Sequence, residues 1–140
     1  MNFIKANLDD AQALADQLKI PVQFVLAVSI DESDFRRSNI AMQAHNYFGI
    51  HTGGANSTGT YTTSQGLRVS SYTGSDDPYF DSGQDFVNTE VGNRAAFGAT
   101  TADKFFTAIH DQYGLGATTE EYVNNMRSIA RITALRITCP

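Results

Sequence analysis

The sequence is short of cysteine, of long apolar runs and of positive charge, and each shortage excludes a class of protein. Its one cysteine, Cys139, cannot form an internal disulfide, so no disulfide framework supports the fold. No apolar run approaches the ~20 residues of a membrane-spanning helix, so we expect no membrane span. Residues 1–5 lack a basic segment followed by an apolar one and predict no secretory signal peptide. The formal net charge of −5, with scattered Lys and Arg, argues against a nucleic-acid partner.

The remaining composition is that of an ordinary folded domain. Hydrophobic residues make up 41% of the sequence and charged residues 18%, which argues against an intrinsically disordered chain. A length of 140 residues suits one domain with one core, and no repeat or low-complexity linker divides it. We therefore expect a single domain over residues 1–140.

Apolar periodicity predicts helices towards both ends of the sequence and a small β lobe between them. Asn7 begins a capping pattern for the first helix, and Thr118 opens a capping box for the last. Glycines punctuate two alternating runs, 60–63 and 67–72, which predict a hairpin with its turn near Gly66. This order predicts an α+β fold with a cleft where the β lobe meets the helical body. The predicted helices cover residues 8–18, 22–33, 38–44, 82–91, 102–113 and 119 onwards.

Glu32 stands at the C-terminal end of the helix predicted over 22–33, which is apolar on nearly every side. Burial, the neighbouring carboxylates Asp31 and Asp34, and the negative end of the helix dipole are all expected to raise the pKa of Glu32. A carboxylic acid that keeps its proton near neutral pH is suited to general acid catalysis of glycoside cleavage. The alternative interpretation is a solvated carboxylate at a helix end.

Four segments follow one another in the order of a known family. Residues 27–35 read Ala-Val-Ser-Ile-Asp-Glu-Ser-Asp-Phe, and residues 45–51 read His-Asn-Tyr-Phe-Gly-Ile-His. Residues 114–122 read Gly-Leu-Gly-Ala-Thr-Thr-Glu-Glu-Tyr, and 79–86 match the element that leads into the helix after the β lobe. Together these segments resemble the bacterial glucosaminidases of glycoside hydrolase family 73. That family carries Glu-Ser-Gly-Trp-Gly at a helix end, then Asn-Asn-Leu-Phe-Gly-Ile-Lys and later Gly-Tyr-Ala-Thr-Asp-Pro-x-Tyr-Ala.

The resemblance implies a fold and an activity. The expected fold is lysozyme-like, a mostly helical body with a small β-hairpin lobe flanking a cleft, in a single glucosaminidase domain over 1–140. The expected reaction is cleavage of the β-1,4 bond after N-acetylglucosamine in peptidoglycan, with Glu32 as the acid. For Phe48 and Tyr122 the residues alone leave simple core packing as an equal alternative. The resemblance implies that substrate is bound by Ser33, Asn46, Phe48 and Tyr122.

The sequence departs from the family pattern at two places. Asp34 and Phe35 replace the Gly-Trp pair, so an aromatic residue remains one place along. Family members usually offer a second carboxylate in the β lobe, but residues 52–75 contain no Asp or Glu. Asp76 or Asp77, just past the lobe, is a candidate catalytic base, although a loop charge beside a helix is the alternative. Otherwise the substrate's own acetamido group is expected to attack, as in substrate-assisted enzymes.

Three tyrosines, Tyr61, Tyr72 and Tyr79, have two interpretations. Aromatic rings at a cleft rim stack on sugar faces, and on this basis Tyr61 is a candidate substrate-binding residue. Equally, folding a hairpin onto helices requires aromatic residues. No cofactor is expected, and the three histidines do not form a ligand cluster with metal-ligand spacing, so no metal site is expected. These histidines are His45, His51 and His110.

Three hypotheses about function remain open. The first is a β-N-acetylglucosaminidase acting on peptidoglycan glycan strands in the periplasm or cell wall. The second keeps the fold but is a muramidase or lytic transglycosylase of phage type. The acid-poor β lobe favours the transglycosylase, because that reaction can proceed with one carboxylate. The third is a non-catalytic glycan-binding domain. Because no signal peptide is predicted, we expect delivery by type VI secretion as an antibacterial toxin, or by phage lysis. A toxin implies an immunity protein that occludes the cleft.

Overall fold

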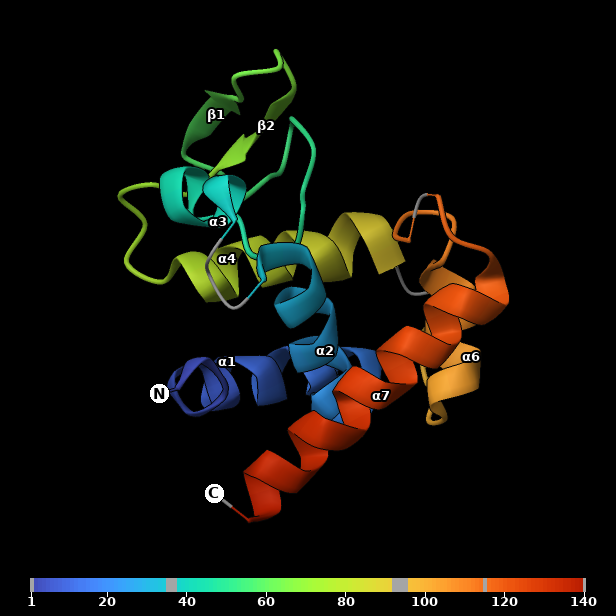
Figure 1. Cartoon of the computed structure of the whole chain (residues 1–140). Helices are drawn as coiled ribbons and strands as arrows, with labels where there is room; N and C mark the ends of the chain where they lie inside the picture. Colours follow the sequence, from blue (N-terminus) through green and yellow to red (C-terminus); the bar gives the residue numbers. More distant parts are fainter. Residues whose placement is uncertain (1, 35–37, 92–95, 115, 140) are drawn as a thin grey trace.

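The most buried helix of the protein, α2 (Val22–Ser33), lies between α1 (Phe3–Leu18) and α7 (Thr119–Thr138). The computed structural model describes residues 2–34, 38–91, 96–114 and 116–139. Every residue from Phe24 to Ile30 is buried, because this stretch is apolar all round except for Ser29. Figure 1 shows α2 upright in the middle of the helical body, with its C-terminal end pointing towards the β lobe.

The first helix begins earlier than the sequence predicts. Asn2 is its N-cap and accepts a hydrogen bond from Lys5 N at 3.5 Å. The predicted start at Asn7 is wrong, because Asn7 lies inside the helix and its side-chain amide donates to Phe3 O at 2.9 Å. A capping pattern in the sequence does not tell which of two nearby asparagines is used.

The chain turns sharply between α1 and α2. Lys19 adopts a left-handed backbone with φ 55°, and Pro21 is the N-cap of α2. Within the described ranges, no single helix is long and apolar enough to cross a membrane. As a pair, α1 and α2 meet the length and composition criteria, but they are bent by 116° relative to each other.

The predicted β lobe is confirmed. It contains the short helix α3 (Asn39–Ala44) and an antiparallel hairpin of β1 (Gly59–Thr62) and β2 (Arg68–Ser71). In the turn, Gly66 has φ +84° and its amide donates to Thr63 O at 2.9 Å. Hydrogen bonds from Ser70 N to Ile50 O and from Tyr72 N to Ala44 O hold the hairpin to the end of α3 and to the segment that follows it.

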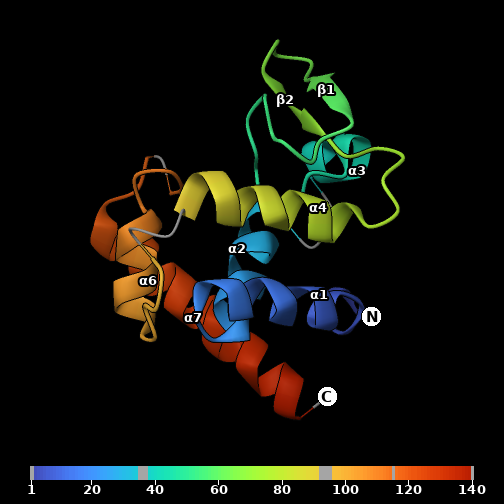
Figure 2. The same cartoon turned by 180° about the vertical axis from the view of Figure 1, so that it is seen from behind.

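A long element runs from the lobe back into the helical body. It consists of α4 (Pro78–Asp85) and a following π-helical stretch, η1 (Phe86–Val91). Figure 2 shows this element passing between the lobe and α1. The predicted start at residue 82 is wrong, because Asp77 caps the helix through Phe80 N and Pro78 supplies its first residue.

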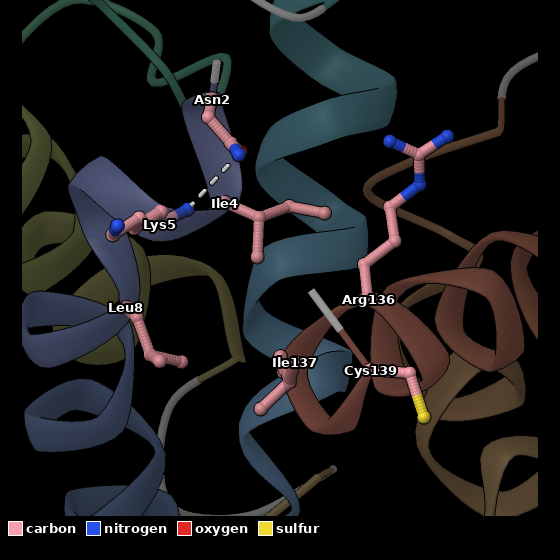
Figure 3. Close-up of a pocket in the computed structure, with 7 residues that line it drawn as sticks. All are labelled: Asn2, Ile4, Lys5, Leu8, Arg136, Ile137 and Cys139. Carbon is pink, nitrogen blue, oxygen red and sulfur yellow. Dashed lines mark hydrogen bonds between the residues drawn. The ribbon is translucent and has the colours of Figure 1, made fainter.

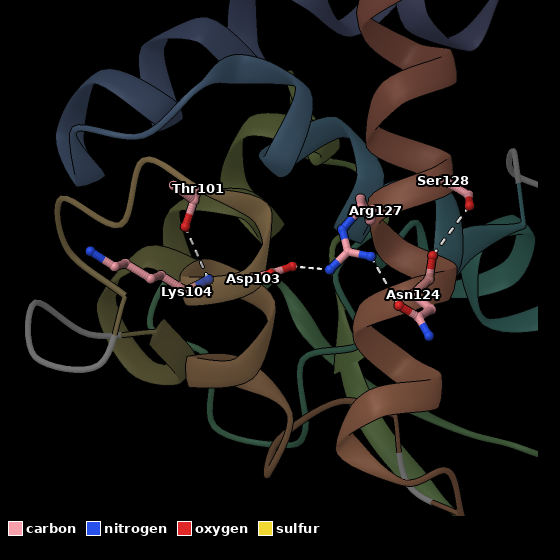
Figure 4. A network of polar contacts seen from close by, with 6 residues as sticks. All are labelled: Thr101, Asp103, Lys104, Asn124, Arg127 and Ser128. Carbon is pink, nitrogen blue, oxygen red and sulfur yellow. Dashed lines mark hydrogen bonds and ion pairs between the residues drawn. The ribbon is translucent and has the colours of Figure 1, made fainter.

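The last two helices close the other side of the body. The predicted capping box of α7 is confirmed: Glu121 N donates to Thr118 Oγ1 at 3.1 Å, and Thr118 N donates to Glu121 Oε1 at 2.8 Å. The helix α6 (Ala102–Ile109) ends four residues before the predicted end at 113. On the surface, Arg127 of α7 forms an ion pair with Asp103 of α6 (Figure 4). Both side chains are largely exposed, so this pair contributes little to stability.

Candidate active site

The Glu32 carboxyl lies directly against the backbone of Gly49. Glu32 is in the last turn of α2 and its side chain is half-buried. A Cβ atom built on Gly49 would lie 2.3 Å from Glu32 Oε1 and 3.3 Å from Glu32 Cδ, so a side chain there would displace the Glu32 carboxyl. Gly49 also has φ +64°, a left-handed conformation that glycine adopts without strain. The segments singled out in the sequence around Glu32 and Gly49 therefore meet in space.

Asn46 closes the loop that carries Gly49. Its Oδ1 accepts from Ile50 N at 3.0 Å, and its Nδ2 donates to Ile50 O at 2.8 Å. The same Nδ2 donates to Ser70 O on β2 at 3.0 Å. Because Asn46 is only 1% exposed, its side chain shapes the loop from within and joins it to the β lobe.

Phe48, in the same loop, packs its ring into the core. The ring is fully buried, with its centroid 5.2 Å from that of Tyr79 and 5.3 Å from that of Phe86. Its backbone carbonyl accepts a hydrogen bond from the Tyr113 hydroxyl. The core-packing interpretation therefore describes this ring, and the residue supports Gly49 from beneath.

Tyr122, in the first turn of α7, lies within electrostatic range of Glu32. Burial raises the pKa of the Tyr122 hydroxyl, and the negative charges of Asp31 and Glu32 raise it further. The side chain is 4% exposed, and its hydroxyl is buried without a hydrogen-bond partner among the described residues. Gly114 lies against one part of the ring, where an added Cβ would be 2.4 Å from Tyr122 Cδ1. An unpaired buried hydroxyl of this kind is uncommon in proteins.

The two remaining sequence-predicted binding residues, Ser33 and Tyr61, have different surroundings. Ser33 is fully buried and its hydroxyl donates to Ser29 O, one turn earlier in α2. Tyr61 is half-buried on β1 and borders a cavity of about 360 Å³ between the hairpin and the start of α3. Phe35, which stands in place of the family's Trp, lies outside the described residues.

The two candidate bases have different surroundings. Asp76 is exposed in the loop before α4. The Asp77 carboxyl caps α4 and shares a hydrogen bond with Asp10 of α1. Burial, this hydrogen bond and the nearby charges of Asp77 and Asp9 raise the pKa of Asp10 to about 7. The contacts of Asp77 are therefore with α1 and α4, and a catalytic role for either aspartate remains a prediction.

Asp85 is a fully buried carboxylate that the sequence did not single out. It accepts hydrogen bonds from the Tyr72 hydroxyl at 2.6 Å, from Asn56 N at 3.0 Å and from Asn56 Nδ2 at 2.7 Å. These bonds tie the loop after residue 52 to the end of α4. The sequence did contain an indication that Asp85 is buried, since this residue stands directly before the apolar pair Phe86 and Val87. The buried rings of Tyr72 and Tyr79 fit the hairpin-packing interpretation.

A separate pocket opens where the start of α1 meets the end of α7 (Figure 3). None of its described lining residues carries a carboxyl group, so it lacks the acid needed for glycoside cleavage. In the part of the chain that the structure describes, no three His, Cys, Asp or Glu residues are grouped so as to hold a metal ion. The pocket is lined by Asn2, Ile4, Lys5, Leu8, Arg136, Ile137 and Cys139.

Comparisons with known proteins agree on one family and one fold. The family model for glucosaminidase, described as mannosyl-glycoprotein endo-beta-N-acetylglucosaminidase, matches residues 8–135. A search of curated proteins gives no significant match. A type VI secretion system effector–immunity complex from Pseudomonas protegens contains a chain with 23% identity and a TM-score of 0.79, over 98% of this chain and 92% of that one. A peptidoglycan hydrolase from Sphingomonas sp. A1 has 25% identity and a TM-score of 0.73, over 96% of this chain and 89% of that one. The fold is lysozyme-like.

Proposed function

The chain belongs to the glucosaminidase family, and we propose that it hydrolyses the β-1,4 bond after N-acetylglucosamine in peptidoglycan glycan strands. Family membership supports the sugar and the bond. The similarity to a peptidoglycan hydrolase over almost the whole of both chains supports the polymer.

In this proposal Glu32 is the general acid that protonates the leaving oxygen of the glycosidic bond. The observation that carries it is the half-buried Glu32 carboxyl against the backbone of Gly49, within electrostatic range of Tyr122, whose hydroxyl has no hydrogen-bond partner among the described residues. A carboxyl in this position has the Gly49 backbone on one side and the Tyr122 phenol within electrostatic range. We further propose that Tyr122 and Tyr61 contact the glycan. Ser33, Asn46 and Phe48 would hold the binding surface from beneath, since all three are buried.

The second catalytic group is proposed from what the lobe contains. Residues 52–75 have no Asp or Glu, and the Asp77 carboxyl is engaged by Phe80 N and Asp10. Attack by the substrate's acetamido oxygen on its own anomeric carbon needs no protein nucleophile, which favours substrate assistance over Asp76 or Asp77 as the base. The same acid-poor lobe favours one second candidate, a lytic transglycosylase. In that reaction the C6 hydroxyl of the sugar attacks its own anomeric carbon, and the glycosidic oxygen leaves with the proton from the acid.

We also propose that the protein is an antibacterial toxin. The similar chain from Pseudomonas protegens comes from an effector–immunity complex of a type VI secretion system, over 98% of the present chain. In this setting the protein acts in the periplasm of a neighbouring cell, and an immunity protein blocks the site around Glu32. Expression directed to the periplasm should lyse the host cell, cytoplasmic expression should not, and the Glu32→Gln variant should be harmless in both. Periplasmic expression of active enzyme without lysis would contradict the toxin role.

The catalytic proposal is tested by digestion of purified sacculi. Glu32→Gln removes the transferable proton but keeps the shape of the side chain, so we expect a rate loss of about 10²- to 10⁴-fold with an unchanged thermal midpoint. Asp16→Asn, which neutralises an exposed carboxylate on α1, is the matched control and should keep its activity. Mass spectrometry of the wild-type fragments then identifies the reaction. Reducing N-acetylglucosamine ends support the hydrolase, 1,6-anhydro ends support the transglycosylase, and full activity in Glu32→Gln contradicts the proposal.

A further inference from the structure

The segment that touches the Glu32 carboxyl accepts a hydrogen bond from the helical body, donated by the buried phenol of Tyr113. Its hydroxyl donates to Phe48 O at 2.7 Å, across 65 positions of sequence. The Tyr113 side chain is 4% exposed, and its ring centroid lies 5.8 Å from that of Phe86. The accepting carbonyl belongs to the residue directly before Gly49. The bond therefore fixes the peptide unit that Glu32 contacts.

Tyr113 is also adjacent in sequence to the glycine that packs against Tyr122. Tyr113 directly precedes Gly114, whose φ of +74° turns the chain onto the ring of Tyr122. Tyr122 in turn lies where the charge of Glu32 raises its pKa. Tyr113 therefore joins the loop that carries Gly49 to the segment that packs on the Tyr122 ring.

Other hydrogen bonds hold the loop at its two ends and at Tyr47, whose N donates to Ser82 Oγ of α4 at 3.4 Å. The Asn46 side chain bonds Ile50 N and Ile50 O, and it bonds Ser70 O of the β lobe. These contacts attach the loop to the lobe, which is a small unit held by few elements. The Tyr113 hydroxyl bonds the peptide unit directly before Gly49 and, together with the buried Phe48 ring, attaches this part of the loop to the helical body.

We propose that Tyr113 is a positioning residue for catalysis, setting the distance between the Glu32 carboxyl, the Gly49 peptide and the Tyr122 phenol. This inference rests on the proposed function, in which Glu32 is the acid. Misplacement of a catalytic group by ~1 Å lowers rates up to ~100-fold without abolishing substrate binding. Loss of the hydroxyl is therefore expected to lower kcat more than it changes KM.

The test compares two Tyr→Phe variants on a soluble chitooligosaccharide or peptidoglycan fragment. Tyr113→Phe should lower kcat about 10- to 100-fold and change KM by less than about threefold, with unchanged circular dichroism. Tyr72→Phe is the matched control, because it removes a buried hydroxyl that donates to Asp85 at 2.6 Å, where the hairpin meets α4. Its kcat should stay within about twofold of wild type. Full kcat in Tyr113→Phe, or an equal loss in both variants, would overturn the proposal.

Two further measurements separate this inference from the proposed function. In Gly114→Ala the added methyl group pushes against the Tyr122 ring, so this variant should also lose kcat. Full activity in Gly114→Ala would contradict the proposed link between Tyr113 and Tyr122. If wild-type protein cleaves no substrate, the proposed function fails, and hydrogen exchange then tests the link alone. The Ile50 amide should exchange at least about tenfold faster in Tyr113→Phe than in Tyr72→Phe. Equal exchange in the two variants would overturn the positioning role.

Discussion

The Glu32 carboxyl occupies the space in which a side chain at Gly49 would begin. Oε1 lies 2.3 Å from the position of an ideal Cβ, and the backbone at Gly49 has φ +64°. Position 49 is thus restricted twice, once by the acid and once by the backbone. The acid has a fixed neighbour on that side, and this neighbour is a peptide unit whose position does not depend on rotamers.

Gly49→Ala is predicted to damage both activity and stability. The left-handed backbone costs about 1–2 kcal/mol for alanine. The new methyl group also displaces Glu32, which should lower the rate about 100-fold. Gly98→Ala is the control, since Gly98 has φ +72° and nothing within 4 Å of its added Cβ. Sacculus digestion and thermal unfolding should show similar destabilisation in both variants but a loss of activity only in Gly49→Ala.

Asp85→Ala is predicted to lower the free energy of unfolding by about 3–5 kcal/mol, because it leaves buried donors without an acceptor. The donors are Asn56 N, Asn56 Nδ2 and the Tyr72 hydroxyl. Urea unfolding measures the loss, and limited proteolysis should cut the loop around residue 56 first. Tyr72→Phe removes only one donor and should cost less. A cost below that of Tyr72→Phe would contradict the anchoring role of Asp85.

Asp10→Asn is predicted to stabilise the protein at alkaline pH. The pKa of Asp10 is raised from 3.8 to about 7 in the folded protein, so the folded state binds the extra proton between these values. The stability that this proton contributes is present at low pH and is lost as the pH rises through 7. Because the carboxyl groups of Asp10 and Asp77 are partly exposed, we expect the free energy of unfolding to rise by about 0.5–1 kcal/mol at pH 8 and to stay unchanged near pH 4. Thermal unfolding at several pH values measures it, and a gain that is independent of pH would contradict the shared proton.

Asp77→Asn separates a structural aspartate from a catalytic one. Asparagine caps helices about as well as aspartate, so α4 should persist while the repulsion with Asp10 disappears. We expect sacculus digestion to stay within about twofold of wild type, since the carboxyl is used by α4 and α1. Asp76→Asn serves as a parallel measurement on the exposed neighbour. A loss of about 10²-fold or more in either variant would instead assign that residue as the base.

The sequence predicted the parts of this protein that local pattern determines. The apolar run of α2, the capping box at Thr118 and the turn at Gly66 each depend on residues close together in the chain. The fold and the pairing of Glu32 with the loop around Gly49 came from ordered motifs. These motifs indicate which segments meet, but they do not give the contact between them.

The remaining features depend on residues far apart in the sequence. The bond from Tyr113 to Phe48 spans 65 positions, and Asp10 meets Asp77 from another helix. No periodicity reports such pairs, because each partner has an ordinary local environment. The early start of α4 was missed for a different reason: an Asp-Pro pair at a helix start also fits a loop.

The burial of α2 has a consequence for the order in which this protein loses its structure on warming. The helix that carries Glu32 is enclosed by α1 and α7, whereas the loops that face the acid are held by a few side-chain hydrogen bonds. Subglobal opening of those loops should therefore precede melting of α2. Heated samples would keep their far-ultraviolet helical signal at temperatures where turnover has already stopped, and cooling from that range would restore activity without refolding of the core.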